Sequence, residues 1–277
     1  MEKLLELALN PEPFDEGTHN IWQDPQRSEL VLKTHFDENI PGGSKSTTFI
    51  KETVEMLKEL APVQSFKNVL DLACGPGRYS EELAKLGYDV TGIDYNKVAI
   101  DYAIEEAKKK HLEIEYLVDD ITNLKIDRKF DLILLIYHVY GSFDPIQRRK
   151  ILESVYSKLN NGGLVVLDVL SESSYDNYGQ NFVWGLSRKD NFFSNKKHLT
   201  LSSTLKYPNK VSLAKNVIVF GDGELVNYNY WNQHYSIEDL KNEVKEVGFN
   251  VQKVFADVNG GEYDPKKEEF AVILTKK

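Results

Sequence analysis

The alternation of apolar runs with helical stretches predicts an α/β fold over the middle of the chain. Short runs rich in aliphatic residues are typical of buried strands and lie at 68–72, 88–93, 114–118, 130–136 and 163–169. Stretches with apolar residues at helical spacing lie between them, at 77–86, 96–110 and 145–160. Repeated βα units of this length favour a parallel sheet with helices on both faces and right-handed crossovers.

The pattern changes on both sides of this region. Before residue 60, Pro and Gly positions separate three candidate helices, the last at 47–60, which predicts a helical N-terminal cap over residues 1–60. Residues 171–194 are polar and aromatic with little periodicity. Three strand-like runs then follow, joined by turn residues, and they indicate an antiparallel β-meander: 198–207, 210–220 and 224–235.

The last segment of the chain predicts one helix and two strands. Ser236 is a candidate N-cap, with Asp239 at the capping-box position, and Gly248 marks the end of that helix. The strands are expected at 249–258 and 269–275. We therefore expect an α/β fold with a Rossmann-like, seven-stranded, mostly parallel sheet. The C-terminal segment completes this sheet, and the meander is inserted before that segment. The expected divisions are the N-terminal cap at 1–60, the cofactor-binding core at 61–170, the inserted meander at 171–235 and the C-terminal helix and hairpin at 236–277.

Composition and charge narrow the class of protein. The 277 residues are 41% hydrophobic and 28% charged, an ordinary globular balance, and the formal net charge is −9. This negative charge argues against nucleic acid or an anionic membrane as a partner. Cys74 is the only cysteine, which excludes an intrachain disulfide. With no signal-peptide pattern and no run of ~20 apolar residues, we expect a cytoplasmic protein.

Candidate chemistry is concentrated where two of the predicted strands end. The first strand carries Asp71 and runs into a Gly-Pro-Gly turn at 75–77, and the second strand ends on Asp94. Open α/β sheets bind ligands at the carboxyl ends of their strands. A carboxylate beside the Gly-rich turn disfavours a pyrophosphate and suits a ligand that carries an ammonium and a sulfonium, such as S-adenosylmethionine.

An ordered set of motifs resembles the class I S-adenosylmethionine-dependent methyltransferases. The motifs are LDLACGPG at 70–77, GIDYN at 92–96, VDDI at 118–121, FDLIL at 130–134 and LNNGGL at 159–164. The resemblance covers roughly residues 45–170 and 236–277. It implies S-adenosylmethionine as the cofactor. The main alternative is a nicotinamide- or flavin-binding Rossmann domain. The sequence fingerprint of that domain has a third glycine at the position where this chain has Ser80, which disfavours this alternative.

The resemblance also implies a set of cofactor-binding residues. Glycines in the first motif allow a tight turn and a close approach of the backbone. The acid that ends the second strand can accept from both ribose hydroxyls, and the choice of Asp120 over Asp119 for the adenine amine comes from the family register. Tyr95 and Ile121 are placed to sandwich the adenine. The complete set is Asp71, Ala73, Cys74, Gly75, Gly77, Asp94, Tyr95, Asp120, Ile121 and Ile136.

The methyl acceptor is expected over the end of the fourth strand. His138 is the candidate general base, because a neutral imidazole is available near pH 7, and Tyr137 is a second catalytic candidate. Tyr140, Trp22 and Tyr230 are candidate substrate contacts. Each of these side chains could equally be a structural or packing residue. No metal site is expected, since His19 and His35 lack close ligand spacing.

The predicted function is methyl transfer from S-adenosylmethionine to oxygen or nitrogen of a small molecule. In methyltransferases that resemble this chain, a small antiparallel sheet after the fifth strand commonly covers a small-molecule site, and segment 14–45 is expected to close over the cofactor. The meander could also form a homodimer surface. The alternatives are an RNA or protein methyltransferase, or a non-catalytic protein that binds the cofactor.

Overall fold

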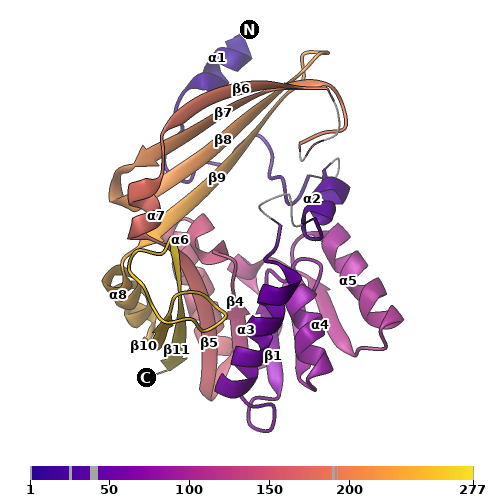
Figure 1. Ribbon diagram of the computed structural model, residues 1–277, viewed down its shortest axis with the longest axis vertical. Helices are drawn as coiled ribbons and strands as arrows, with labels where there is room; N and C mark the ends of the chain where they lie inside the picture. Colours follow the sequence, from indigo (N-terminus) through magenta and orange to yellow (C-terminus); the bar gives the residue numbers. More distant parts are fainter. Residues whose placement is uncertain (1, 25–26, 38–42, 189–190, 192, 277) are drawn as a thin grey trace.

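The central sheet has seven strands in the order β3-β2-β1-β4-β5-β11-β10 (Figure 1). The computed structural model describes residues 2–24, 27–37, 43–188, 191 and 193–276. The strands are β1 (Asn68–Leu72), β2 (Asp89–Asp94), β3 (Ile114–Val118), β4 (Phe130–Leu135), β5 (Leu159–Ser171), β10 (Phe249–Phe255) and β11 (Glu269–Lys276). The first five are parallel, and β11 runs antiparallel to its neighbours β5 and β10. This confirms the expected fold.

Helices cover both faces of the sheet because alternate strand residues point to opposite sides. On one face, Leu70 and Leu72 belong to the apolar core under α6 and α8. On the other, Val69 packs in the core under α3 and α4, with α5 beside them against β3. The helices are α3 (Thr47–Leu60), α4 (Arg78–Lys85), α5 (Lys97–Lys109), α6 (Pro145–Lys158) and α8 (Ile237–Val247). The predicted capping box of α8 is present, with Ser236 and Asp239 bonded reciprocally.

The inserted meander has four strands within the described residues, one more than the pattern predicts. They are β6 (Asn181–Ser187), β7 (His198–Tyr207), β8 (Val211–Phe220) and β9 (Leu225–Tyr235), in spatial order β9-β8-β7-β6. β6 was missed because it is the exposed edge strand, and side chains on both of its faces reach solvent. It therefore shows no alternation of apolar and polar residues, and it is held by backbone pairing with β7.

The meander is attached where the core sheet ends. The last two residues of β5 pair with the last two of β9, Leu170 with His234 and Ser171 with Tyr235. Short elements complete this edge: α7 (Glu172–Asn177), η1 (Ile121–Asn123), η2 (Val139–Ser142) and η3 (Pro208–Lys210). In Figure 1 the meander rises from the edge of the sheet at which the parallel strands end. We call this edge the carboxyl edge.

The N-terminal segment crosses from the meander to the core. It begins with α1 (Glu2–Ala8) and runs along β9, where the backbone of Asn227 exchanges hydrogen bonds with Thr18 and His19. Gly17 is required there, since a Cβ would lie 2.3 Å from the carbonyl oxygen of Asn227. The segment continues to α2 (Ser28–Thr34), which contacts α5. Three candidate helices were expected before residue 60, and α1, α2 and α3 are present.

Two further sequence predictions, a loop at 41–44 and a helix that begins after Pro25, fall partly outside the described residues. The division at residues 60, 170 and 235 stays a prediction. Among the described helices, none is long and apolar enough to cross a membrane.

Candidate functional site

The Gly-rich turn between β1 and α4 is braced by the acid that ends β2. Ala73, Gly75 and Gly77 have positive φ angles of 55°, 54° and 78°. Asp94 Oδ2 accepts a hydrogen bond from the Gly75 amide at 2.8 Å, and Asp94 Oδ1 accepts from the Asn96 amide at 2.8 Å. The turn and the end of β2 therefore form one rigid unit at the carboxyl edge. Each Asp94 oxygen keeps a second lone pair for a ligand hydroxyl.

Asp71 lies beneath the turn and is only 2% exposed. Its Oδ2 accepts a hydrogen bond from the Ser80 hydroxyl at 2.6 Å. Burial and the neighbouring Asp94 raise the pKa of Asp71 to about 7. Ser80, which stands where the dinucleotide fingerprint has its third glycine, is thus the partner of this carboxylate. Motif reasoning placed Asp71 at the turn but could not show that it is buried.

Two of the glycines serve packing as well as backbone conformation. A Cβ on Gly77 would lie 2.1 Å from the Tyr116 hydroxyl oxygen, and a Cβ on Gly92 would lie 2.7 Å from the Tyr116 ring. These glycines make room for Tyr116 of β3. By contrast, a Cβ on Gly75 would meet the His35 ring at 3.1 Å. Of these three positions, Gly75 is the one that faces the N-terminal segment. Cys74 packs its sulfur toward β2, near Gly92.

Hydrogen bonds from Arg78 hold part of the N-terminal segment over this turn. Arg78 Nη1 donates to the carbonyl oxygens of His35 and Lys45 at 2.8 and 2.9 Å. His35 Nδ1 lies 2.9 Å from Ser44 Oγ, and its ring centroid is 6.2 Å from that of Trp22. Burial and the charge of Arg78 lower the pKa of His35 to about 4, so its imidazole is neutral. His35 therefore presents an uncharged imidazole ring to Gly75 of the Gly-rich turn.

The predicted adenine residues lie beyond β2 and β3. The hydroxyl of Tyr95 is 3.2 Å from Asn20 Oδ1, which links it to the N-terminal segment. Asp120 is exposed and caps η1 by accepting from the Thr122 amide and hydroxyl, both at 2.8 Å. Ile121 and Ile136 are each 6% exposed. The choice of Asp120 over Asp119 stays a prediction.

The end of β4 is held in an unusual conformation by a buried acid. Tyr137 and His138 have φ angles of 71° and 58°, a left-handed region that non-glycine residues rarely adopt. Asp168 of β5 is fully buried and accepts from both backbone amides, Tyr137 at 3.0 Å and His138 at 2.9 Å. Such strain persists where the surroundings enforce it and is concentrated at functional sites. The fold thus fixes the candidate base, His138.

A network of charged side chains surrounds His138. Its Nε2 contacts Glu269 Oε2 and lies 3.6 Å from Asp168 Oδ2. Lys45 Nζ bonds to Glu269 at 2.7 Å and to Asp257 at 2.9 Å. The ammonium of Lys45 therefore belongs to this network.

The pKa values of two acids in the network, Asp257 and Glu269, are shifted in opposite directions. Burial and Glu269 raise the pKa of Asp257 to about 6. Burial alone would raise the pKa of Glu269, but hydrogen bonds from His138 and Lys45 hold it well below its usual range. Atoms of His138, Asp168 and Glu269 lie within 4.8 Å of one another. Because Lys45 already neutralises Glu269, we interpret this group as an ion-pair network.

Sequence reasoning missed Asp168, Asp257 and Glu269. They come from β5, from the loop after β10 and from β11, and topology alone brings them to the end of β4. The available signal was an acid inside the apolar run VVLDVL at 165–170. An acid that is buried in a central strand needs partners, and here the partners are the two left-handed residues.

The candidate substrate residues have different environments. Tyr140 is fully buried, donates to Glu243 and stacks near Tyr235, which is the environment of a core residue. Its contact with the acceptor stays a prediction. Trp22 packs with the aromatic residues of the meander, as the packing alternative expected. The Tyr230 hydroxyl is buried without a hydrogen-bond partner in the described structure.

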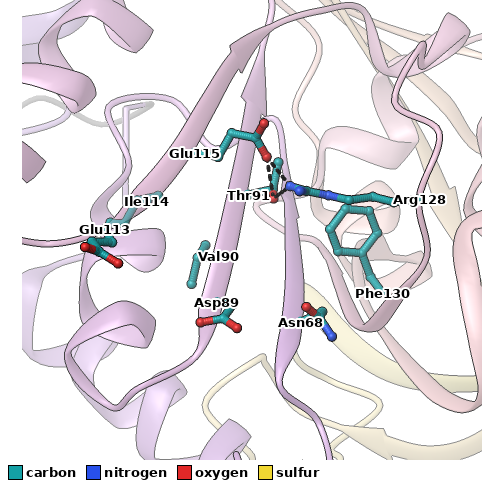
Figure 2. Close-up of a pocket in the computed structure, with 9 residues that line it drawn as sticks. All are labelled: Asn68, Asp89, Val90, Thr91, Glu113, Ile114, Glu115, Arg128 and Phe130. Carbon is teal, nitrogen blue, oxygen red and sulfur yellow. Dashed lines mark hydrogen bonds and ion pairs between the residues drawn. The ribbon is translucent and has the colours of Figure 1, made fainter.

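A separate hollow lies at the opposite edge of the sheet. Figure 2 shows it among the first residues of β1 to β4, where Arg128 contacts Glu115 and Thr91. Asn68, Asp89 and Ile114 begin their strands here. Open α/β sheets bind their ligands at the other end of the strands. We therefore do not assign the hollow to the cofactor.

Comparisons with known proteins identify a methyltransferase domain in this chain. Residues 69–163 match a family described as "Methyltransferase domain". A protein of Geobacillus sp. (strain WCH70) that is named as a methyltransferase is 26% identical over 201 residues, which cover 70% of this chain and 78% of that protein. The ubiquinone biosynthesis O-methyltransferase of Pelagibacter ubique (strain HTCC1062) is 40% identical over 89 residues, 31% of this chain and 37% of that enzyme.

The fold also matches a solved structure over nearly its whole length. The CcbJ methyltransferase of Streptomyces caelestis superposes with a TM-score of 0.70 at 15% identity, covering 93% of this chain and 98% of that one. This likeness shows the fold, while the matched domain at 69–163 spans the Gly-rich turn and Asp94. Residues 69–163 therefore form a methyltransferase domain, and the chain has the fold of S-adenosylmethionine-dependent methyltransferases.

Proposed function

We propose that the protein transfers the methyl group of S-adenosylmethionine to an oxygen or nitrogen of a small molecule at the carboxyl edge. The observation that carries this proposal is the enforced left-handed conformation of Tyr137 and His138, which presents an imidazole beside the predicted cofactor site. The protein residues fit the cofactor: a rigid Gly-rich turn, the free lone pairs of Asp94, and the unpaired Tyr230 hydroxyl. The aromatic ring of Tyr95 would flank the adenine.

The reaction needs positioning and removal of one proton. When bound, S-adenosylmethionine supplies a methyl carbon that is already activated by its positive sulfur. That carbon would accept a lone pair of the acceptor, and the electrons of the carbon–sulfur bond would leave with sulfur. His138 takes the proton of the acceptor, and Tyr137 orients the acceptor in the same turn. The N-terminal segment excludes water from this edge.

A small acceptor is supported by how the site is covered. The meander and the N-terminal segment together pack an aromatic cluster that includes Trp22, Phe193 and Tyr230. One relative is an O-methyltransferase of ubiquinone biosynthesis. The net charge of −9 disfavours RNA. Action on RNA or protein, and binding without catalysis, are the alternatives that an acceptor screen decides. A cytoplasmic location stays a prediction.

The most direct test is product formation. The full chain is incubated with S-adenosylmethionine and a panel of phenols, alcohols, amines, RNA and peptides, and S-adenosylhomocysteine is measured. We expect formation of S-adenosylhomocysteine with a small hydroxyl or amine compound. Turnover with RNA or peptide alone would favour the first alternative. Tight cofactor binding without turnover across the panel would favour a binding protein.

Cofactor binding should release protons near pH 7. In the free protein the pKa of Asp71 is raised to about 7, mainly by burial and to a smaller extent by the nearby charge of Asp94. A positively charged ligand nearby favours the carboxylate, lowers this pKa and expels the proton, so affinity should fall as the pH drops from 8 to 6. Calorimetry at pH 7 in phosphate and in Tris should therefore give different enthalpies. Asp71→Asn should abolish the difference, and equal enthalpies for the unmodified protein would contradict this role.

The meander is also the expected surface for a homodimer. β6 is an edge strand, and it carries exposed apolar side chains, with Phe182 77% and Trp184 73% exposed. Unpaired backbone groups and apolar side chains together favour antiparallel pairing with a second copy. Light scattering after size exclusion should give the dimer mass for the native protein and the monomer mass for Trp184→Glu. Ile146→Glu, at an exposed site on α6, should remain dimeric. A monomeric native protein would rule out this dimer.

A further inference from the structure

The two ring nitrogens of His138 have different environments. Nε2 is shielded from solvent and forms an ion-pair contact with Glu269 Oε2 whose geometry falls outside that of a hydrogen bond. The side chain as a whole is 20% exposed, so its exposed surface belongs to side-chain atoms other than Nε2. No partner of Nδ1 is found within the described part of the chain. Nδ1 is therefore the nitrogen that a molecule at the carboxyl edge can reach.

Glu269 is held so that its second oxygen faces His138. Its Oε1 accepts from Lys45 Nζ at 2.7 Å, which leaves Oε2 toward the imidazole. The register explains why the two acids meet: Glu269 pairs with Leu170 and Ala271 pairs with Asp168, so Glu269 and Asp168 are diagonal neighbours on one face of the sheet. Asp168 is occupied by two backbone amides. Glu269 is thus the carboxylate that can accept a proton-bearing Nε2.

We propose that Glu269 is a positioning residue for His138: its Oε2 accepts a hydrogen bond from Nε2–H and leaves Nδ1 as the atom that takes a proton from the methyl acceptor. The inference rests on the proposed function. In the reaction, the acceptor's O–H or N–H bond breaks, its electron pair forms the bond to the methyl carbon, and the proton moves to Nδ1. The resulting imidazolium is stabilised by Glu269 and Asp168. A base of this kind suits a hydroxyl acceptor, which must lose a proton to become a good nucleophile.

The charges around His138 define what a titration should show. Asp168 on β5 and Glu269 on β11 face the ring, with Lys45 before α3, Asp257 after β10 and His234 on β9 farther out. Burial lowers the pKa of His138, but the two facing carboxylates outweigh burial and Lys45 and raise it above its ordinary value. His138 is then the neutral base only above this raised pKa.

The test reads the imidazole itself, without an acceptor. The full chain, labelled with ¹⁵N-histidine and kept in EDTA, is titrated in long-range ¹H–¹⁵N spectra, and the His138 signals are assigned by their loss in His138→Asn. The neutral ring should carry its proton on Nε2, and its pKa should lie above 6.5. Glu269→Gln should lower that pKa by about 1 unit or more, as expected for loss of a charge in direct contact. The matched control, Glu268→Gln at the exposed neighbouring residue, should leave it unchanged.

Two outcomes would overturn the proposal: a neutral His138 protonated on Nδ1, or a Glu269→Gln titration identical to that of the native protein. If Glu269→Gln does not fold, Lys45→Gln carries the test, because removal of a cation should raise the pKa of His138. An unchanged or lowered pKa in Lys45→Gln would contradict the network. Calorimetry with S-adenosylmethionine on the same samples distinguishes failure of the proposed function from failure of the role given to Glu269. A protein that does not bind the cofactor would contradict the proposed function, whereas the tautomer of His138 would still be determined.

Discussion

Replacing His138 with asparagine is expected to lower turnover by about 10²–10⁴-fold, the range attributed to a positioned general base. Asparagine tolerates the left-handed backbone that His138 adopts, so the fold of the turn should survive. Affinity for S-adenosylmethionine should stay within about threefold, because His138 is not among the predicted cofactor contacts, which lie at the ends of β1, β2 and β4 and on η1. The measurement is kcat with the first acceptor found, beside the cofactor Kd.

The matched control for this prediction is His111→Asn. His111 is also left-handed, with a φ of 55°, but it lies in the exposed turn between α5 and β3. It should keep full turnover. Normal turnover in His138→Asn would remove His138 as the base and leave positioning of the acceptor as the main contribution of the protein.

Replacing Asp94 with alanine is expected to weaken binding of S-adenosylmethionine by about 100-fold. The variant loses the ribose contacts of both carboxylate oxygens, and hydrogen bonds to charged groups contribute about 1.5–3 kcal/mol each. It also frees the Gly75 and Asn96 amides, so the Gly-rich turn loses its brace. Calorimetry measures the affinity, and circular dichroism measures whether the fold persists.

Two further variants separate the ribose contact from the brace. Asp94→Asn keeps one acceptor oxygen and should fold better, with a smaller loss of affinity. Asp89→Asn lies at the opposite end of the same strand, where Asp89 pairs with Lys67 on the surface, and should bind normally. Unchanged affinity in folded Asp94→Ala would show that this acid does not hold the ribose.

The core was predictable from sequence because its signals are local. β1 and β3 have the expected bounds, and α8, the helix after the meander, has its predicted N-cap, Ser236. Buried parallel strands are continuous apolar runs, and the turns between them use residues with special backbone freedom. The Gly-rich turn and Asp94 could be placed for the same reason, since they are adjacent to strand ends.

The remaining features depend on contacts between distant segments. Asp168 and Glu269 meet His138 only because β11 inserts beside β5, and neither acid is part of a motif. Tyr140 follows β4 as a site residue would, yet it turns into the core to meet Glu243. β6 has no pattern because both of its faces are exposed. Such features follow from topology and packing, which residue spacing does not encode.

The measurement that tests the account most directly is calorimetry of the purified chain with S-adenosylmethionine, S-adenosylhomocysteine and NAD. The account predicts saturable binding of the first two at one site and no binding of NAD, because buried Asp71 and Ser80 replace the features that receive a pyrophosphate. Binding of NAD in place of S-adenosylmethionine would contradict the cofactor site, and with it the roles given to Asp94 and His138.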